Sequence, residues 1–409
     1  MIKTPEKKTA LTLRSQNDKI TTHQLFLLYI GILLTPCTRY APIVAAKYGR
    51  YAGWVAAVFC ALLIFGLIFV LSKAVDGYLK KQKEKNSNAP SGGENSEEQG
   101  GGADTGSDIR KDDGPCLALM MNEAFGKPVS KIIMVLFLAW ALILLSFYTR
   151  ATSERLQTTI FINSDARFFL LCMAAINYFV WRGRLEAFGR FAEVITLLFV
   201  GVMVLFVTLL IPSVKLSNVL PVTYKDIPGV AETVFRLASQ LGMITLLMFL
   251  GGHIVTTEKM VKQGMRVSLF IGAMVTVTLF VTIGGLGYRL TTRMPLPFFG
   301  ALKLVNFLDP LDRMAPIVVS VWIFADFLLC VAYGFAIMNL LRRIFGTKDS
   351  RAFAAPTALW TYVSGLFFSK SQFESENFTG SMLACLISFV LFYAVPVVML
   401  AVGKARKKL

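Results

Sequence analysis

The sequence has 409 residues, of which 55% are hydrophobic and 12% aromatic, while only 16% are charged. This bias excludes an ordinary soluble domain and indicates a membrane protein. The formal net charge of +17 at pH 7 is compatible with nucleic-acid binding. With a cytoplasmic amino terminus, however, about two thirds of the 42 lysines and arginines fall on the cytoplasmic side. We therefore expect a bilayer-embedded chain with both termini in the cytoplasm and no nucleic-acid partner.

Ten segments are predicted to cross the bilayer as helices. A hydrocarbon core of about 30 Å takes about 20 helical residues, and a helix bonds every backbone group within its own segment. Seven long windows contain no Asp, Glu, Lys or Arg: Tyr51–Ser72, Ile132–Thr149, Val194–Val214, Leu237–Thr257, Val267–Tyr288, Ala352–Ser369 and Asn377–Gly403. Three further segments are shorter or carry a single charge: Ile20–Ala46, Phe168–Trp181 and Met314–Leu341.

Polar segments flank and separate these spans. Residues 1–19 form a basic tail expected in the cytoplasm, and spans one and two occupy residues 20–81. Residues 82–113 are rich in Gly, Ser, Asn, Asp and Glu, so they cannot bury a core and are predicted to form a disordered, acidic cytoplasmic loop. This loop is either a tolerated insertion or a docking or regulatory segment. Spans three to ten occupy residues 114–403, and residues 404–409 form a basic cytoplasmic tail.

The first span is interrupted by residues that a lipid-facing helix rarely contains. Its sequence, IGILLTPCTRYAPIVAAKYG, places Arg39 between two prolines. Proline removes a backbone donor and disfavours helical geometry in the residue before it, so we expect the helix to end near Leu34–Thr35 and to restart at Pro42 or just before it. Cys37, Thr38 and Arg39 would then lie in unwound backbone, at a site for a carboxylate or another anionic group. Alternatively, Arg39 reaches the outer surface and the prolines only kink the helix.

Span six is predicted to repeat this interruption. Ten spans divide into five plus five, and an odd number of spans per half makes the second half enter the membrane in the opposite orientation. Inverted repeats of this kind break the first helix of each half near the middle of the membrane. In span six, Arg236 is followed by Ser239, Gln240 and Gly242 near the midpoint. The predicted fold is therefore an all-α polytopic membrane protein, a LeuT-like inverted repeat with broken helices 1 and 6.

Span eight carries a carboxylate, Asp326, at its midpoint. Trp322 and Asp326 lie four residues apart and share one helix face. A carboxylate in lipid becomes protonated or pairs with a cation, and in a five-plus-five fold spans one, six and eight meet centrally, so we predict an Arg39–Asp326 pair. The alternatives are that Asp326 binds an amine of the ligand or that the pair is purely structural.

Nothing in the sequence indicates catalysis. The chain lacks the nucleophile, phosphate-binding and metal-ligand motifs that define common enzyme sites. Its six cysteines form no CxxC pair and its two histidines are far apart, so they are interpreted as apolar filler and isolated polar residues rather than ligands. We expect neither an enzyme nor a metal or other cofactor.

Several stretches together resemble a known family. They are KITTHQLFLLYIGILL at the start of span one, MNEAFGKPVSKIIMVLFLAWALILLSFYTRATSE around span three, FVWRGRLEAFGRFAEVITLL between spans four and five, and LVNFLDPLDRMAPIVVSVWIFADFLLCVAYGFA at span eight. Their order and spacing resemble the B subunit of bacterial spore germinant receptors, a permease-like family within the amino acid–polyamine–organocation transporter superfamily. The family often has a lysine where Asp326 stands and an acidic residue where Met243 or Ile244 stands.

The resemblance implies a role and a set of partners. It implies that the chain lies in the spore inner membrane, binds a small germinant such as an amino acid or a sugar, and signals germination with A and C receptor subunits. Together with the helix breaks, it makes Cys37, Thr38, Arg39, Ser239, Gln240, Gly242, Trp322 and Asp326 the candidate ligand-binding residues. An autonomous proton-coupled amino acid transporter, with Asp326 as its protonatable group, and a channel-forming subunit are the alternatives.

Overall fold

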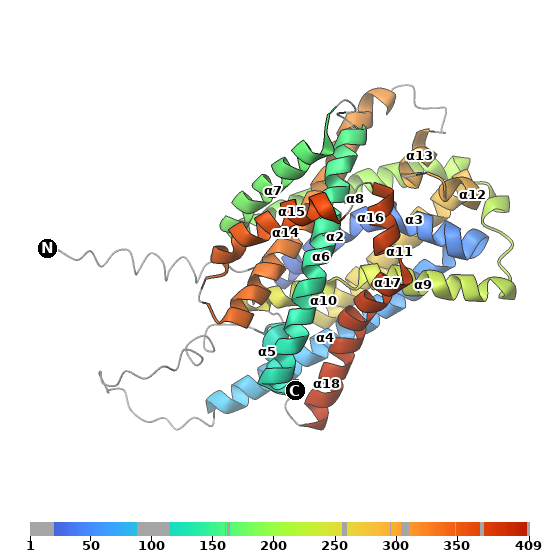
Figure 1. Cartoon of the computed structure of the whole chain (residues 1–409). Helices are drawn as coiled ribbons and strands as arrows, with labels where there is room; N and C mark the ends of the chain where they lie inside the picture. The colour runs from blue at the N-terminus through green and yellow to red at the C-terminus, as the bar shows by residue number, and fades with distance from the viewer. Residues whose placement is uncertain are drawn as a thin grey trace, which may run out of the picture.

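The computed structural model describes residues 20–87, 115–159, 161, 164–255, 260–294, 296–303, 311–347, 349–368 and 372–406. The tail 1–19 lies outside these residues, as does residue 88 onward of the expected loop 82–113. Residues 82–87 are helical, because the second span continues as a helix as far as Ser87. Helices dominate the described part of the chain and form a bundle of long, mostly apolar rods (Figure 1).

The first half of the chain contains the elements of spans one to five. They are β1 (Ile20–Thr21), α2 (Thr22–Thr38), α3 (Tyr40–Val44), the π-helix η1 (Ala45–Gly49), the 3₁₀ helix η2 (Arg50–Ala52), α4 (Val55–Ser87), α5 (Leu117–Phe125), α6 (Lys127–Thr159), α7 (Ala166–Arg182) and α8 (Leu185–Leu210). The 3₁₀ helices η4 (Ile211–Ser213), η5 (Leu216–Asn218) and η6 (Tyr224–Asp226) connect α8 to the second half.

The second half contains spans six to ten. Its elements are α9 (Ile227–Leu241), α10 (Ile244–Leu247), η7 (Met248–His253), β2 (Ile254–Val255), α11 (Met260–Leu286), α12 (Tyr288–Thr291), α13 (Pro297–Lys303), α14 (Leu311–Phe345), η8 (Ser350–Phe353), α15 (Ala354–Phe367), α16 (Gln372–Thr379), α17 (Met382–Phe389), the π-helix η9 (Val390–Ala394) and α18 (Val395–Ala405).

The helices have the length and hydropathy of membrane spans. Within the described residues, seven are long and apolar enough to cross a bilayer, and the pair Thr22–Thr38 and Tyr40–Ala52, bent by 43°, makes an eighth. The shorter helices α7 and α15, of 17 and 14 residues, pack against each other and against α6 and α14. They correspond to spans four and nine, so the described helices account for all ten predicted spans. The chain is an all-α, multi-pass membrane protein.

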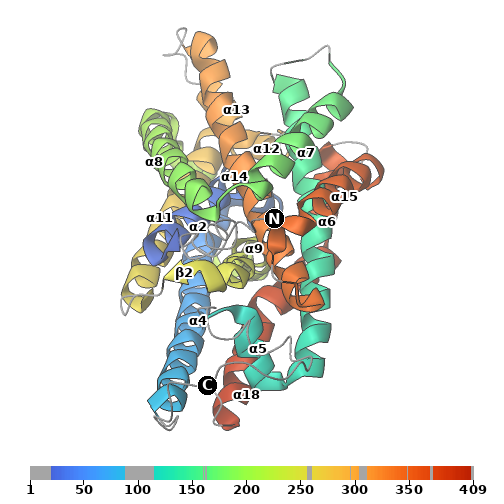
Figure 2. The same ribbon diagram turned by 90° about the vertical axis from the view of Figure 1, so that its left-hand side faces the viewer.

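Helix packing follows the symmetry of a five-plus-five repeat. In such a repeat, each span of the first half has an equivalent five spans later in the second half. Spans two and seven (α4 and α11), three and eight (α6 and α14), and four and nine (α7 and α15) are equivalent in this way, and the two members of each pair are in contact. The contact between α2 and α8 is equivalent to the contact between α9 and α17, and the contact between α2 and α11 is equivalent to that between α9 and α4. All four contacts are present. Figure 2 shows α14 between α8 on one side and α6, α7 and α15 on the other. The predicted inverted repeat is confirmed.

A short backbone ladder joins the two halves at one end of the bundle. Strands β1 and β2 pair in parallel, with Ile20 opposite Ile254 and Thr21 opposite Val255. The side chain of Thr21 caps α2 by accepting a hydrogen bond from the backbone N–H of Gln24, whose own side chain accepts one from Thr21 N. The start of span one is thereby tied to the end of span six, away from the two helix breaks.

Candidate functional site

A small buried cavity lies where α2, α3, α6, α9, α14 and α16 converge. Its volume of about 10 Å³ gives room for about one water molecule. The residues that line it are Thr35, Pro36, Arg39, Tyr40, Tyr148, Arg155, Gln240, Asp326, Leu329 and Thr379. Three of these side chains are charged, two arginines and one aspartate, so the lining concentrates ionic groups inside an apolar bundle.

The first helix break places Arg39 at this cavity. Helix α2 runs through its internal proline to Thr38, and Arg39 leaves regular helical geometry with φ −108° and ψ −67°. Pro42 has no N–H, so it cannot donate to the carbonyl of Thr38 as a helical residue would, and the helix bends there. The hydroxyl of Thr38 donates to the carbonyls of Leu34 and Thr35, which supports the last turn.

The expected end of the first helix near Leu34–Thr35 is therefore wrong by about one turn. Cys37 and Thr38 are helical rather than unwound, and the break is confined to Arg39. The reason is that a proline inside a helix removes only one donor, and the buried surroundings of Pro36 keep the rest of the turn intact.

The second break lies at Gly242 and Met243, between α9 and α10. The hydroxyl of Tyr29, on α2, donates to the carbonyl of Leu241 at 2.5 Å, so the first broken span contacts the last residue of the helix before the second break. A Cβ on Gly242 would lie 2.5 Å from the Tyr393 ring, and this close approach of span ten explains the glycine. The expected interruption of span six is confirmed.

Asp326 has a partner that the sequence analysis did not identify. Oδ2 of Asp326 lies 2.7 Å from Nη1 of Arg155 on α6, and the two side chains are 1% and 8% exposed. A buried ion pair is costly to desolvate and very costly to separate, so the two helices are held in register at this point. Arg39 lines the same cavity as this pair, and its predicted pairing with Asp326 stays a prediction.

Neutral polar groups complete the lining. The hydroxyl of Tyr148 donates to Oε1 of Gln240 at 2.8 Å, and Nε2 of Gln240 donates to the carbonyl of Thr379 at 3.2 Å. This chain of hydrogen bonds links α6, α9 and α16 across the site. Among the described residues, the buried hydroxyl of Thr35 has no hydrogen-bond partner. An unsatisfied buried hydroxyl costs free energy, which is characteristic of a site that a water or ligand completes.

Of the eight candidate residues, Arg39, Gln240 and Asp326 line this cavity and the other five do not. Cys37 packs in the apolar core, and Trp322 packs in a second apolar cluster with its ring centroid 5.5 Å from that of Phe299. The hydroxyl of Ser239 donates to the carbonyl of Arg236 within its own helix at 2.7 Å. In the conformation described, Cys37, Trp322 and Ser239 therefore pack or bond outside the lining of the cavity.

Sequence reasoning missed the contribution of span three. Tyr148 and Arg155 lie seven residues apart, which is two helical turns, so both face the cavity from α6. The apolar window of that span ends at Thr149, so the charges that follow it lie outside the predicted span. Helix α6 continues to Thr159, and Arg150, Glu154 and Arg155 are all buried. The seven-residue spacing puts Tyr148 and Arg155 on one helix face, but it indicates a site only once the helix is known to continue past Thr149.

No metal centre accompanies this site within the described part of the chain, where no three His, Cys, Asp or Glu side chains could hold an ion together. A search of curated proteins finds no match to the chain. Its fold is similar to that of a crystal structure of MhsT in complex with L-phenylalanine, with a TM-score of 0.59, 13% sequence identity, and coverage of 94% of this chain and 98% of MhsT. At this identity the similarity concerns the fold alone.

A sequence model of the family described as spore germination protein, a spore permease, matches residues 109–373. The match covers more than half of the chain and includes the elements from α5 to α15 that carry Arg155, Gln240 and Asp326. Together with the confirmed fold, it identifies a permease-like membrane protein. The chain belongs to the spore germination protein family.

Proposed function

We propose that this chain is the permease-like subunit of a nutrient germinant receptor in the spore inner membrane, with both termini in the cytoplasm. It binds a small, amino-acid-like germinant in the central cavity between the broken spans one and six. The observation that carries this proposal is the lining of that cavity, where Arg39 and Arg155 bring two guanidinium groups to Asp326, the one carboxylate among the described residues that line it. A zwitterion supplies both charges that such a lining complements, a carboxylate for an arginine and an ammonium group for the aspartate.

Signalling would follow from the size of the cavity. Room for about one water molecule cannot accommodate an amino acid, so a ligand must separate the helices around the site. The ligand would thereby favour a second arrangement of spans one and six over the one described. The A and C receptor subunits would respond to that change of arrangement.

Ligand binding by the purified full-length chain in lipid nanodiscs tests the proposal. Thermal unfolding is measured with each of the common L-amino acids, because a ligand that binds only the folded state raises the melting temperature. Replacing Arg39 by Gln removes a charge-assisted contact of about 1.5–3 kcal/mol and should weaken the best ligand by at least about tenfold. Gln240→Leu should also weaken it, whereas the neighbouring Ser239→Ala should not, since that hydroxyl bonds within its own helix. Unchanged affinity in both Arg39→Gln and Gln240→Leu would overturn the assignment of the site.

An autonomous proton-coupled transporter is the second candidate, favoured by the burial of the Asp326 carboxylate at the site. The purified chain alone in proteoliposomes distinguishes the two functions. Accumulation of labelled amino acid driven by a pH gradient, and lost in Asp326→Asn, would support the transporter. Binding without accumulation would support the receptor subunit.

A further inference from the structure

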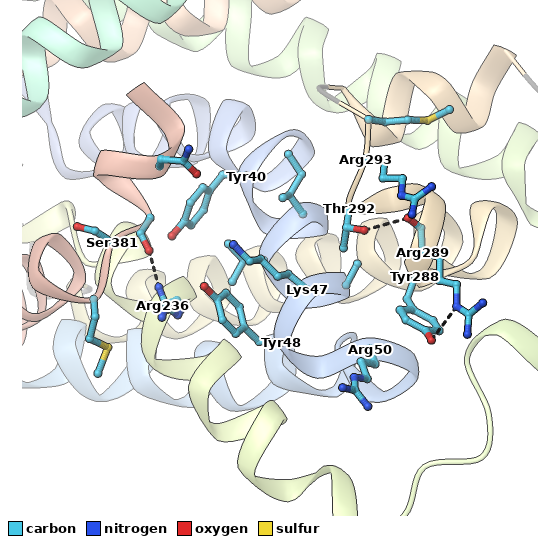
Figure 3. Close-up of a pocket in the computed structure, with 17 residues that line it drawn as sticks. Tyr40, Lys47, Tyr48, Arg50, Arg236, Tyr288, Arg289, Thr292, Arg293 and Ser381 are labelled. Atoms are coloured by element: carbon cyan, nitrogen blue, oxygen red, sulfur yellow. Dashed lines mark hydrogen bonds between the residues drawn. The ribbon is translucent and has the colours of Figure 1, made fainter. Parts of the chain in front are cut away.

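A second and much larger cavity opens next to the central one. Its volume is about 700 Å³, and it is lined by residues of α3, η1, η2, α9, the segment around α12, and the segment from α16 to α17 (Figure 3). We call it the vestibule. It shares Tyr40 with the central cavity, whose Gln240 lies one helical turn beyond Arg236 of the vestibule. In the topology proposed above, the vestibule faces the outside of the membrane.

The lining of the vestibule is strongly and uniformly basic. Its charged residues are Lys47, Arg50, Arg236, Arg289 and Arg293, and none of the described residues that line it is Asp or Glu. Arg236 is neutralised, because its Nε and Nη2 donate to the carboxylate of Glu232 at 3.0 and 2.7 Å. The ion pairs of the described residues do not include the other four cations.

The base of the vestibule is rigid. The guanidinium of Arg236 stacks over the ring of Tyr48, with 4.1 Å between its Cζ and the ring centroid. Nη1 of the same guanidinium donates to the carbonyl of Gly380, and Figure 3 draws this hydrogen bond as a dashed line that leaves Arg236. The residue is 7% exposed and its fork is fully engaged, so this end of the vestibule is held in one geometry.

The rim carries the positive potential. Lys47, Arg50, Arg289 and Arg293 are exposed, and Figure 3 shows Lys47 and Arg50 on the segment that follows α3 and Arg289 and Arg293 on the segment around α12. The positive charges of the rim act on the hydroxyl of Tyr288. A hydrogen bond from Arg289 and the nearby charges of Arg289 and Arg50 lower the pKa of this hydroxyl. Asp226, which lies near Arg50, accepts hydrogen bonds through Oδ2 from the backbone and the hydroxyl of Thr223.

We propose that the vestibule is a binding site for a small organic anion carrying two or more negative charges. Four cations on the wall of a concave surface focus the field and raise the local concentration of anions. Three of the four are arginines, whose planar forks match carboxylates in two-point contacts. The cavity is large enough for a small multivalent carboxylate. The inference goes beyond the proposed germinant site, because it uses different residues and a different cavity.

Titration of the full-length chain in nanodiscs of phosphatidylcholine, at neutral pH and fixed ionic strength, tests this inference. The probes are citrate, succinate, acetate and glucose, and the readout is heat of binding. Affinity should rise with the charge of the probe, from no binding of glucose to the tightest binding of citrate. Equal affinity for all four probes would overturn the inference.

Matched variants separate the vestibule from the overall charge of the chain. Arg289→Gln with Arg293→Gln should weaken citrate by about tenfold or more, since each loses a charge-assisted contact. Lys215→Gln with Lys225→Gln removes the same net charge at exposed positions outside the vestibule and should leave affinity unchanged. Equal weakening in both double variants would overturn the inference, because it would indicate diffuse attraction only.

Two further measurements of citrate binding distinguish the vestibule from the central cavity and from a lipid-binding site. Arg39→Gln should leave citrate binding intact, since Arg39 lines only the central cavity, so failure of the germinant site and failure of the vestibule give different patterns. Adding phosphatidylglycerol to the nanodisc should also leave citrate affinity unchanged. Loss of citrate affinity in these nanodiscs would overturn the proposed occupant, because an anionic lipid headgroup would then fill the vestibule.

Discussion

Removing either partner of the Arg155–Asp326 pair should strongly destabilise the bundle, and the two changes should differ. The Nη1–Oδ2 distance is 2.7 Å, and the side chains of Arg155 and Asp326 are 8% and 1% exposed, so both charged groups lie out of water and against each other. Arg155→Gln and Asp326→Asn keep most of each side chain and remove one charge. Each should cost about 3–5 kcal/mol of unfolding free energy, because the remaining charge is left buried.

The difference between the two variants comes from Arg39. Among the described residues that line the cavity, Asp326→Asn leaves two guanidinium groups and no carboxylate, whereas Arg155→Gln leaves one group of each sign. At an effective dielectric constant of about 20, charges a few ångströms apart interact by about 4 kcal/mol, so part of that energy favours the second arrangement. We therefore expect Asp326→Asn to cost at least about 1 kcal/mol more than Arg155→Gln. The double variant should cost about 1–3 kcal/mol less than the sum of the two.

Equilibrium unfolding in mixed micelles measures these differences. Five of the six cysteines are buried and all six are free, so a thiol-reactive dye reports unfolding without an added label. Arg190→Gln serves as the control, because its ion pair with Glu186 is exposed and should be worth about 0.5 kcal/mol or less. Strict additivity of the two site variants would refute the coupling. A larger cost for Arg155→Gln would refute the part assigned to Arg39.

Two further predictions concern helix packing and use the same unfolding measurement. Gly334→Ala places a Cβ 2.0 Å from Cε2 of the buried Trp181 and should cost about 1–3 kcal/mol or more. In contrast, the Cβ of Gly66→Ala meets nothing within 4 Å, and this variant should stabilise α4 by about 0.5–1 kcal/mol. Equal effects of the two variants would contradict the packing. Tyr29→Phe leaves the buried carbonyl of Leu241 without its donor and should cost about 1–3 kcal/mol. A neutral result there would indicate that water replaces the hydroxyl.

The architecture could be predicted from sequence because the bilayer imposes it. Uncharged windows of sufficient length have few folded solutions other than spanning helices, and their odd number in each half implies the inverted arrangement. The interruptions were visible for the same reason, since a charge or a run of polar residues in the middle of an apolar segment has no solvent to reach. What composition could not place was the length of the interruption at Arg39, because that depends on which backbone donors the surrounding helices leave intact.

The site was only partly predictable from sequence. Two of the lining residues that were not predicted, Tyr148 and Thr379, carry hydroxyl groups. Tyr148, Gln240 and Thr379 form one hydrogen-bonded chain, yet only the glutamine stood out. Tyrosine and threonine are common in membrane helices, where their hydroxyls usually bond within the bundle, so their presence indicates no site. Only the convergence of three helices, which is a tertiary fact, gives these side chains a common role.

Arg39 and Arg155 show where the limit of such reasoning lies. Both are arginines at one cavity, 8% and 7% exposed as residues, and both are about equally costly to place in a membrane. Arg39 follows 19 residues without a charge other than that of His23 when protonated, so the apolar run before it favours a cavity, with the outer surface beyond it as the alternative. Arg155 lies among Arg150 and Glu154, at the end of an apolar window, where the ordinary explanation is that the span has ended. A buried charge can therefore be recognised from sequence only when the residues around it are apolar enough to make a surface position for that charge improbable. Where a helix extends beyond its apolar window, as α6 does, every charge in the extension needs its partner to be found in the structure.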